Sequence, residues 1–147
     1  MDKKDYDVFL NKANNNSAIA IKAVESKMYH VAISRFYYSV YQKILYVLYA
    51  ESIYDKYDSD RPHNEPYAKF RAQIIPRYLN VIGKFGANDL KRFKQLKDFR
   101  VQADYSNETI DEAIYNSDFR DMYHPFNESI DTIIGEIGGK SREQCKN

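Results

Sequence analysis

The stretch from Ala32 to Tyr49 constrains this chain most, because its apolar side chains repeat with the period of an α-helix. One row of residues recurs at steps of four and three and so shares a helical face: Ile33, Tyr37, Val40, Ile44 and Val47. A second row at the same spacing begins polar and ends apolar: Arg35, Tyr38, Gln42, Leu45 and Tyr49. We therefore expect a helix whose first face is buried in the core and whose second, partly polar face contacts something other than the core.

The remaining sequence predicts further helices and no sheet. The chain has 5 glycines and 4 prolines, and no Asn-Gly or Asp-Gly pair flanked by alternating apolar residues marks a hairpin. Helical spacing recurs over residues 6–26, 65–86, 88–103 and 109–137, with a kink or a division expected at Pro76 and again at Pro125. The prediction is an all-α protein, an up-down bundle of four to five helices.

The expected boundaries follow from capping residues and composition. Asn88 or Asp89 is expected to cap the fourth helix, and Thr109 with Glu112 matches a capping box for the last. The chain of 147 residues is long enough for one substantial core. We expect a single domain over residues 1–137 and a disordered tail over 138–147.

Charge and cysteine content exclude several classes of function. Lys and Arg number 22 against 21 Asp and Glu, so no chain-wide field attracts RNA or a membrane, and any RNA contact must be local. Cys145 is the only cysteine, and no two histidines have helical ligand spacing, so neither metal nor cofactor is expected. No signal peptide and no apolar run of about 20 residues is present, which favours a cytoplasmic protein without a membrane partner.

Three motifs, in order and at matching separations, resemble the HEPN domains, helical bundles that include nucleotide-binding proteins and ribonucleases. The first is Arg-Phe-Tyr-Tyr at residues 35–38, the second is Pro62-His63 followed by Phe70, and the third is Arg-Val-Gln-Ala-Asp-Tyr at residues 100–105. The resemblance implies a HEPN-like homodimer with a polar cleft between its second and fourth helices. On this basis Arg35, Tyr38, Arg100, Asp104 and Tyr105 are expected to bind a nucleotide or RNA.

The chain departs from the ribonuclease pattern at its catalytic histidine. Ribonuclease members place a histidine four to six residues after the arginine, and here that window holds Tyr105, Ser106 and Asn107. An arginine stabilises the charge of the phosphorane, and an imidazole moves protons as the 2′-hydroxyl attacks. The catalytic residues are therefore unknown, with Arg100 and His63 as candidates, and the Arg100–Asp104 pair is as expected for a structural i,i+4 contact.

The basic run and the tyrosines each allow two interpretations. Lys91, Arg92, Lys94, Lys97 and Arg100 form the most basic stretch, and a solvated helix face is the favoured interpretation. The 14 tyrosines either stack on nucleobases or pack a helical interface with the hydroxyl in water. We assign Tyr37 and Tyr41 to the core, whereas the loop residues Tyr54 and Tyr57 fit either role.

Three hypotheses follow. The first is a HEPN-like protein with a nucleotide- or RNA-related role in a toxin–antitoxin or antiphage (antiviral) defence system, lacking the standard Arg-His pair and acting beside a nucleotidyltransferase or other protein partner. The second is an active metal-independent endoribonuclease that recruits a histidine from another helix or subunit. The third is a non-catalytic helical dimer or adaptor, in which the motif survives only as packing.

Overall fold

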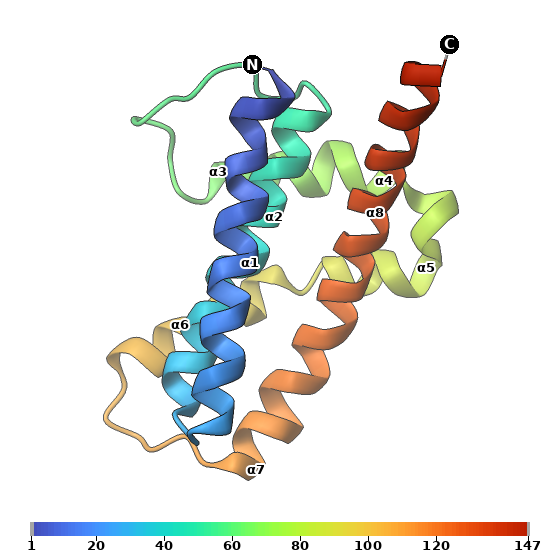
Figure 1. Ribbon diagram of the computed structural model, residues 1–147. Coiled ribbons are helices and arrows are strands. Elements are labelled where there is room, and N and C mark those ends of the chain that lie inside the picture. The colour runs from blue at the N-terminus through green and yellow to red at the C-terminus, as the bar shows by residue number, and fades with distance from the viewer. Residues whose placement is uncertain (1, 147) are drawn as a thin grey trace.

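The computed structural model describes the backbone of residues 2–146, together with their side chains except those of Lys4 and residues 141–146 (Figure 1). Over this range the chain forms six helical segments and no strand. The all-α prediction is confirmed and the arrangement is a helical bundle, with six helical segments over the described residues where the sequence predicts four to five. No helix among the described residues is long and apolar enough to cross a membrane.

The first two helices form an antiparallel hairpin: α1 spans Lys3–Glu25 and α2 spans Tyr29–Ala50. Ala13 and Ala20 are fully buried on α1, and their small side chains let the two backbones approach closely. The Ser39 hydroxyl uses this proximity to donate a 2.8 Å hydrogen bond to the Ala13 carbonyl. Lys27 lies in the left-handed region (φ 59°) while the Met28 amide bonds the Ala23 carbonyl, which ends α1 as a Schellman motif.

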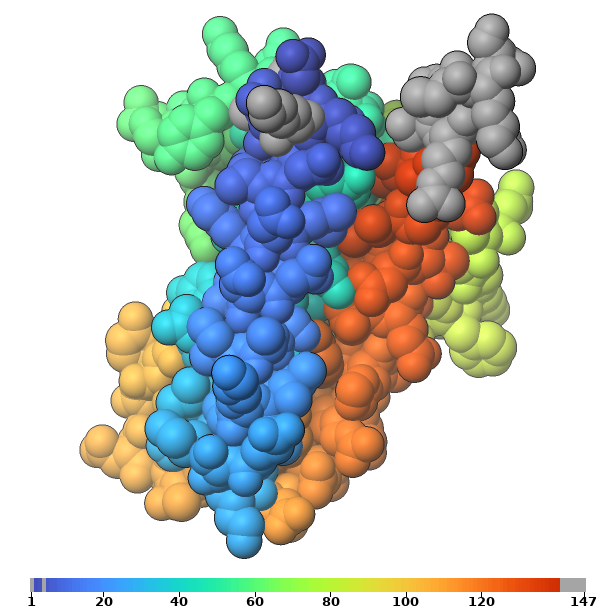
Figure 2. All heavy atoms as spheres, viewed as in Figure 1, coloured from blue at the N-terminus to red at the C-terminus, as the bar shows by residue number. Residues whose placement is uncertain are grey.

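An irregular loop over residues 51–64 leads into a helical segment made of α3 (Glu65–Lys69), a π-helical turn η1 (Phe70–Ile74) and α4 (Ile75–Arg77). The Ile75 amide bonds the Phe70 carbonyl five residues back. This widened turn accommodates Pro76, which lacks an amide proton and would crowd a regular turn. In Figure 2 the loop lies beside the N-terminal half of α1.

The helix that contains Pro76 ends just after the proline, because α4 ends at Arg77 and the next helix begins at Leu79. Helix α5 spans Leu79–Leu90 and is itself broken at Gly83, whose φ of 72° suits glycine. Gly86 does not end it: a Cβ at that position would lie 3.1 Å from Ser129 Oγ, so glycine permits close packing on α8. Asn88 and Asp89 therefore belong to the last turn of α5 and do not cap the next helix.

Helix α6 spans Phe93–Tyr105, and the last segment comprises α7 (Glu112–Ile114), a second π-helical turn η2 (Tyr115–Arg120) and α8 (Asp121–Lys146). The N-cap of α7 is Asp111, which accepts a 2.8 Å bond from the Ile114 amide, so the predicted Thr109 cap is wrong by two residues. The tail expected over 138–147 is helical over 138–146.

Helix α2 is the centre of the bundle and packs against α1, α6, α8 and the helix that begins at Glu65. Its predicted core row is buried: Ile33, Tyr37, Val40, Ile44 and Val47 are all fully inaccessible. In the second row, Tyr38 lies near Arg100 of α6, whereas the α2 residue that lines the candidate site is Tyr37 of the core row.

Candidate functional site

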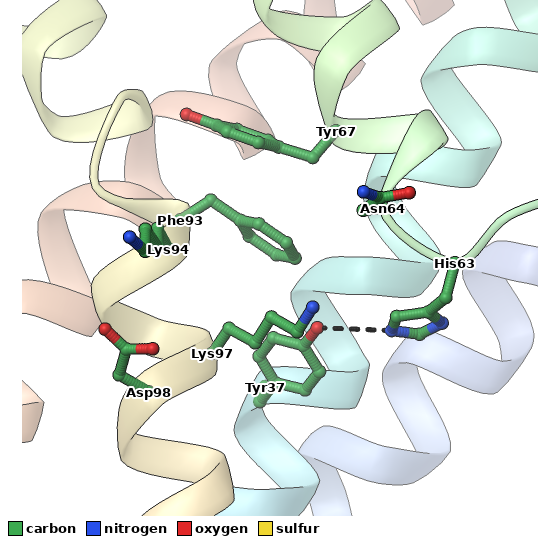
Figure 3. A pocket seen from close by; sticks show the side chains of 8 residues that line it. All are labelled: Tyr37, His63, Asn64, Tyr67, Phe93, Lys94, Lys97 and Asp98. Carbon is green, nitrogen blue, oxygen red and sulfur yellow. Dashed lines mark hydrogen bonds between the residues drawn. The ribbon is translucent and has the colours of Figure 1, made fainter.

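A pocket of about 340 Å³ opens between α2, the start of α3 and α6 (Figure 3). Each of these elements contributes part of its lining, because α2 and α6 pack together and the loop over residues 51–64 returns the chain to the same place. Eight residues surround it: Tyr37, His63, Asn64, Tyr67, Phe93, Lys94, Lys97 and Asp98.

The wall of the pocket is aromatic. Phe93 is buried at the start of α6 and stacks on Tyr67 with ring centroids 4.6 Å apart, and on Tyr37 at 5.3 Å. The Tyr67 hydroxyl donates a 2.8 Å bond to the Leu90 carbonyl at the end of α5. The three rings are thus held in place by packing and by a hydrogen bond to a neighbouring helix, and they give the pocket an apolar wall.

The charged part of the lining comes from one face of α6. Lys94, Lys97 and Asp98 are three and four residues apart, so they project from the same side while Phe93 and Leu96 enter the core. None of the three makes an ion pair in the described part of the chain. Two ammonium groups and one carboxylate leave the pocket with a local positive charge, which suits an anionic ligand.

His63 completes the pocket from the loop. Its ring stacks on Tyr41 at 4.6 Å, and its Nε2 lies 3.4 Å from the Tyr37 hydroxyl. Desolvation lowers the pKa of His63 from its ordinary 6.5, and the charges of Lys97 and Arg100 lower it further. The imidazole is therefore neutral at pH 7 and has one nitrogen available to accept a proton.

Tyr37 stays protonated beside it. Burial raises the pKa of Tyr37 to about 12, although the Arg100 charge acts in the opposite direction. In the tautomer protonated at Nε2, the imidazole donates to the Tyr37 hydroxyl oxygen, which fixes the orientation of the ring and leaves Nδ1 free to accept a proton. A neutral, oriented imidazole next to two lysines is an arrangement that can bind a phosphate and move a proton.

Arg100 lies one turn further along α6, outside the pocket lining. Its guanidinium carbon is 5.2 Å from the Tyr37 ring centroid and 5.7 Å from that of Tyr38, and Nη1 is 3.5 Å from Asp104. Its Nε is buried without a hydrogen-bond partner. Arg100 is therefore held in the seam between α2 and α6, where its charge acts on Tyr37 and His63.

The other predicted site residues separate into two places. Arg35 is exposed, donates a 3.3 Å bond to Asn16 and lines a hollow of about 280 Å³ together with Asp104. Tyr105 is 77% exposed at the end of α6 and lines neither hollow. The structure thus groups His63 with Tyr38 and Arg100 around Tyr37, brings Arg35 to Asp104, and leaves Tyr105 apart.

Sequence reasoning missed Lys97 and the aromatic wall. The predicted solvated face holds for Lys94, which is exposed, but Lys97 is half-buried beside the pocket, and the sequence gives Tyr67 and Asn64 no role. The available signal was the spacing of the two lysines, which puts both on the face of α6 adjacent to buried Phe93. That His63 lies opposite them follows only from the path of the loop.

No group of three or more His, Cys, Asp or Glu side chains in the described chain is arranged to hold a metal ion. Comparison with protein-family models, with curated proteins and with solved structures finds no match to this chain.

Proposed function

We propose that this protein is a HEPN-like helical protein that binds the phosphate of a nucleotide or short single-stranded RNA in the pocket between α2, α3 and α6. One observation carries the proposal: Lys94, Lys97 and neutral His63 converge on a pocket walled by Tyr67 and Phe93. Cations for the phosphate and aromatic rings for the base are the two elements of single-strand recognition.

Lys97 is the residue best suited to test binding. A charge-assisted hydrogen bond to a phosphate contributes roughly 1.5–3 kcal/mol, so Lys97→Ala should weaken binding about tenfold or more. Lys12→Ala provides a matched control, because Lys12 is an exposed lysine on α1 outside the pocket lining. Anisotropy of a labelled RNA pentanucleotide measures both variants, and its salt dependence should become shallower only in Lys97→Ala. Equal affinities for the two variants would refute the proposal.

A second candidate function, metal-independent RNA cleavage, is favoured by the position of His63. Its imidazole lies in the same pocket as Lys97 and takes the role that residues 105–107 do not fill. In this reaction the 2′-oxygen attacks phosphorus and gives its proton to the imidazole. The bond to the 5′-oxygen then breaks as that oxygen takes the proton from the resulting imidazolium, while the nearby Lys97 and Arg100 charges stabilise the phosphorane.

Cleavage is tested in a chelator with a mixed RNA substrate and His63→Gln. His30→Gln serves as the control, since His30 lines the separate hollow near Arg35. Loss of cleavage in His63→Gln alone would support the ribonuclease, and absence of cleavage by the unsubstituted protein would leave RNA or nucleotide binding as the function.

The wider assignment is proposed on the resemblance of residues 35–38, 62–70 and 100–105 to HEPN domains. It comprises a homodimer, a role in toxin–antitoxin or antiphage defence, and a nucleotidyltransferase or other protein partner. Size-exclusion chromatography with light scattering tests the dimer, and toxicity on expression that is lost with the lysine variant tests the defence role.

A further inference from the structure

A second pocket, of about 190 Å³, lies beside the first along α2. The wall between them is the stacked pair of Tyr41 and His63, since His63 lines the first pocket and Tyr41 lines the second. Its remaining lining comes from α1, α2, the loop over residues 51–64 and the start of α3: Phe9, Leu45, Tyr49, Tyr57, Asp58, Ser59, Arg61, Pro62 and Pro66.

The two pockets follow one row of α2. Tyr37, Tyr41, Leu45 and Tyr49 are four residues apart, so they form a ridge that winds around α2 from the first pocket into the second. Tyr37 and Leu45 are eight residues apart, roughly 12 Å along the helix axis. This separation is on the scale of two nucleosides joined by a phosphodiester.

The second pocket differs from the first in charge. Its one cation, Arg61, is already engaged: its guanidinium lies 3.5 Å from the Tyr54 ring centroid, its Nε is 3.5 Å from Glu65, and it donates a 3.1 Å bond to the Tyr49 hydroxyl. The Asp58 carboxylate also faces this pocket. A phosphate is therefore disfavoured here, whereas an uncharged aromatic ring is not.

The exposure of Tyr57 also indicates a ligand in the second pocket. Its side chain lines this pocket with 71% of its surface exposed, so its ring is not used to build the core. The opposite side is the stacked pair of Phe9 and Tyr49, whose centroids are 5.1 Å apart with an interplanar angle of 8°. Exposed aromatic side chains beside a cationic pocket are the arrangement on which successive bases of a single strand stack.

We propose that the pocket lined by Phe9, Tyr41, Tyr49 and Tyr57 is a nucleobase subsite, so that the ligand is at least a dinucleotide with its phosphate at Lys97. This inference rests on the proposed phosphate-binding function of the first pocket. Tyr57 is its stacking residue, and Arg61 positions the loop that carries Tyr57 and His63.

The experiment compares ligands that differ only in their bases. Calorimetry measures the binding of four ligands. The first two are adenosine monophosphate and the 5′-phosphorylated dinucleotide pApA, which carries a 2′-O-methyl group that prevents cleavage. The other two are analogues of pApA in which one adenine or the other is replaced by an abasic sugar. Each is titrated into the unsubstituted protein, Tyr57→Ala and Phe85→Ala. Phe85 is a matched control, because it is an 87% exposed aromatic residue on α5 that lines neither pocket.

Each abasic analogue is expected to bind the unsubstituted protein about tenfold more weakly than pApA, because one has lost the base of the first pocket and the other the base of the second, and stacking of a single base commonly contributes this much. Tyr57→Ala should abolish the difference from pApA for one analogue only, and the identity of that analogue gives the polarity of the strand. Phe85→Ala should preserve both differences.

The possible failures are distinguishable. If adenosine monophosphate binds and one of the abasic analogues matches pApA, the second subsite is refuted while the phosphate site stands. The same holds if Tyr57→Ala keeps the full preference for pApA. If none of the four ligands binds, the proposed function fails, and the subsite fails with it.

Discussion

Replacing Asp131 by asparagine should destabilise this protein more than replacing Lys43 by methionine, although Lys43 is the more buried partner. The Lys43 ammonium donates two 2.7 Å bonds between α2 and α8, to Asn127 Oδ1 and Asp131 Oδ1. Its side chain is 10% exposed, against 50% for that of Asp131. Asp131→Asn removes the charge that balances a buried cation, whereas Lys43→Met removes the cation itself.

The magnitudes follow from these exposures. A hydrogen bond between charged groups contributes roughly 1.5–3 kcal/mol, and the half-exposed carboxylate reduces this, so Asp131→Asn should lower the free energy of unfolding by about 1–2 kcal/mol. For a chain of this length the melting temperature falls about 2–4 °C per kcal/mol. Lys43→Met leaves Asp131 in contact with water and fills the same space with apolar atoms, so its cost should stay under about 1 kcal/mol.

Urea unfolding followed by circular dichroism measures both variants and the double variant. Once Lys43 is methionine, the second change at Asp131 should cost less than about 0.5 kcal/mol, because no buried cation remains to be balanced. The reasoning is refuted if Lys43→Met destabilises the protein as much as Asp131→Asn, since the ion pair would then contribute net stability.

Three further predictions concern ionisation and the end of α1. Burial raises the pKa of Tyr37 from 10.0 to about 12, so the unfolded chain ionises first and roughly 2–3 kcal/mol of the stability held below pH 10 is lost as pH rises toward 12. Urea unfolding at pH 9.5 and 11.5 should show a smaller loss of stability in Tyr37→Phe than in the unsubstituted protein. An equal loss in the two proteins would contradict this prediction. Lys97→Met should raise the pKa of His63 toward 6.5, as read from an NMR titration of the imidazole, because one of the charges that lower it is gone. Lys27→Gly should stabilise the protein by about 0.5–1 kcal/mol in a thermal melt, since Lys27 has a φ of 59°, whereas Lys22→Gly within α1 should destabilise it by about 1 kcal/mol.

The sequence predicts the core helix well and the helix ends less well. The period of four and three over residues 32–49 identifies α2, observed at Tyr29–Ala50, because a row of large apolar side chains has no other way to be buried. Pro76 predicts that the helix is irregular at this point, but it does not predict which form the irregularity takes. Whether the helix stops, kinks or widens into η1 depends on Phe70 and Ile74 filling the core, and that packing is not visible in local spacing.

The candidate site is predicted only in part for a related reason. His63 and Arg100 are identified by motif, and the structure brings the charge of Arg100 close enough to lower the pKa of His63. Lys97 is indistinguishable from a surface lysine until the path of the loop over residues 51–64 is known. That path depends on contacts distant in sequence, such as the Arg61 bond to Tyr49 and the stacking of His63 on Tyr41.

The central claim is that the pocket between α2, α3 and α6 binds a nucleotide phosphate. NMR chemical-shift mapping with adenosine monophosphate tests it directly, because amide and imidazole signals report the binding site residue by residue. The account predicts that the largest shifts fall on His63, Asn64, Lys94 and Lys97 and are lost in Lys97→Ala. Shifts confined to another surface, such as the groove lined by Ile75 and Leu79, or no shifts at all, would contradict it.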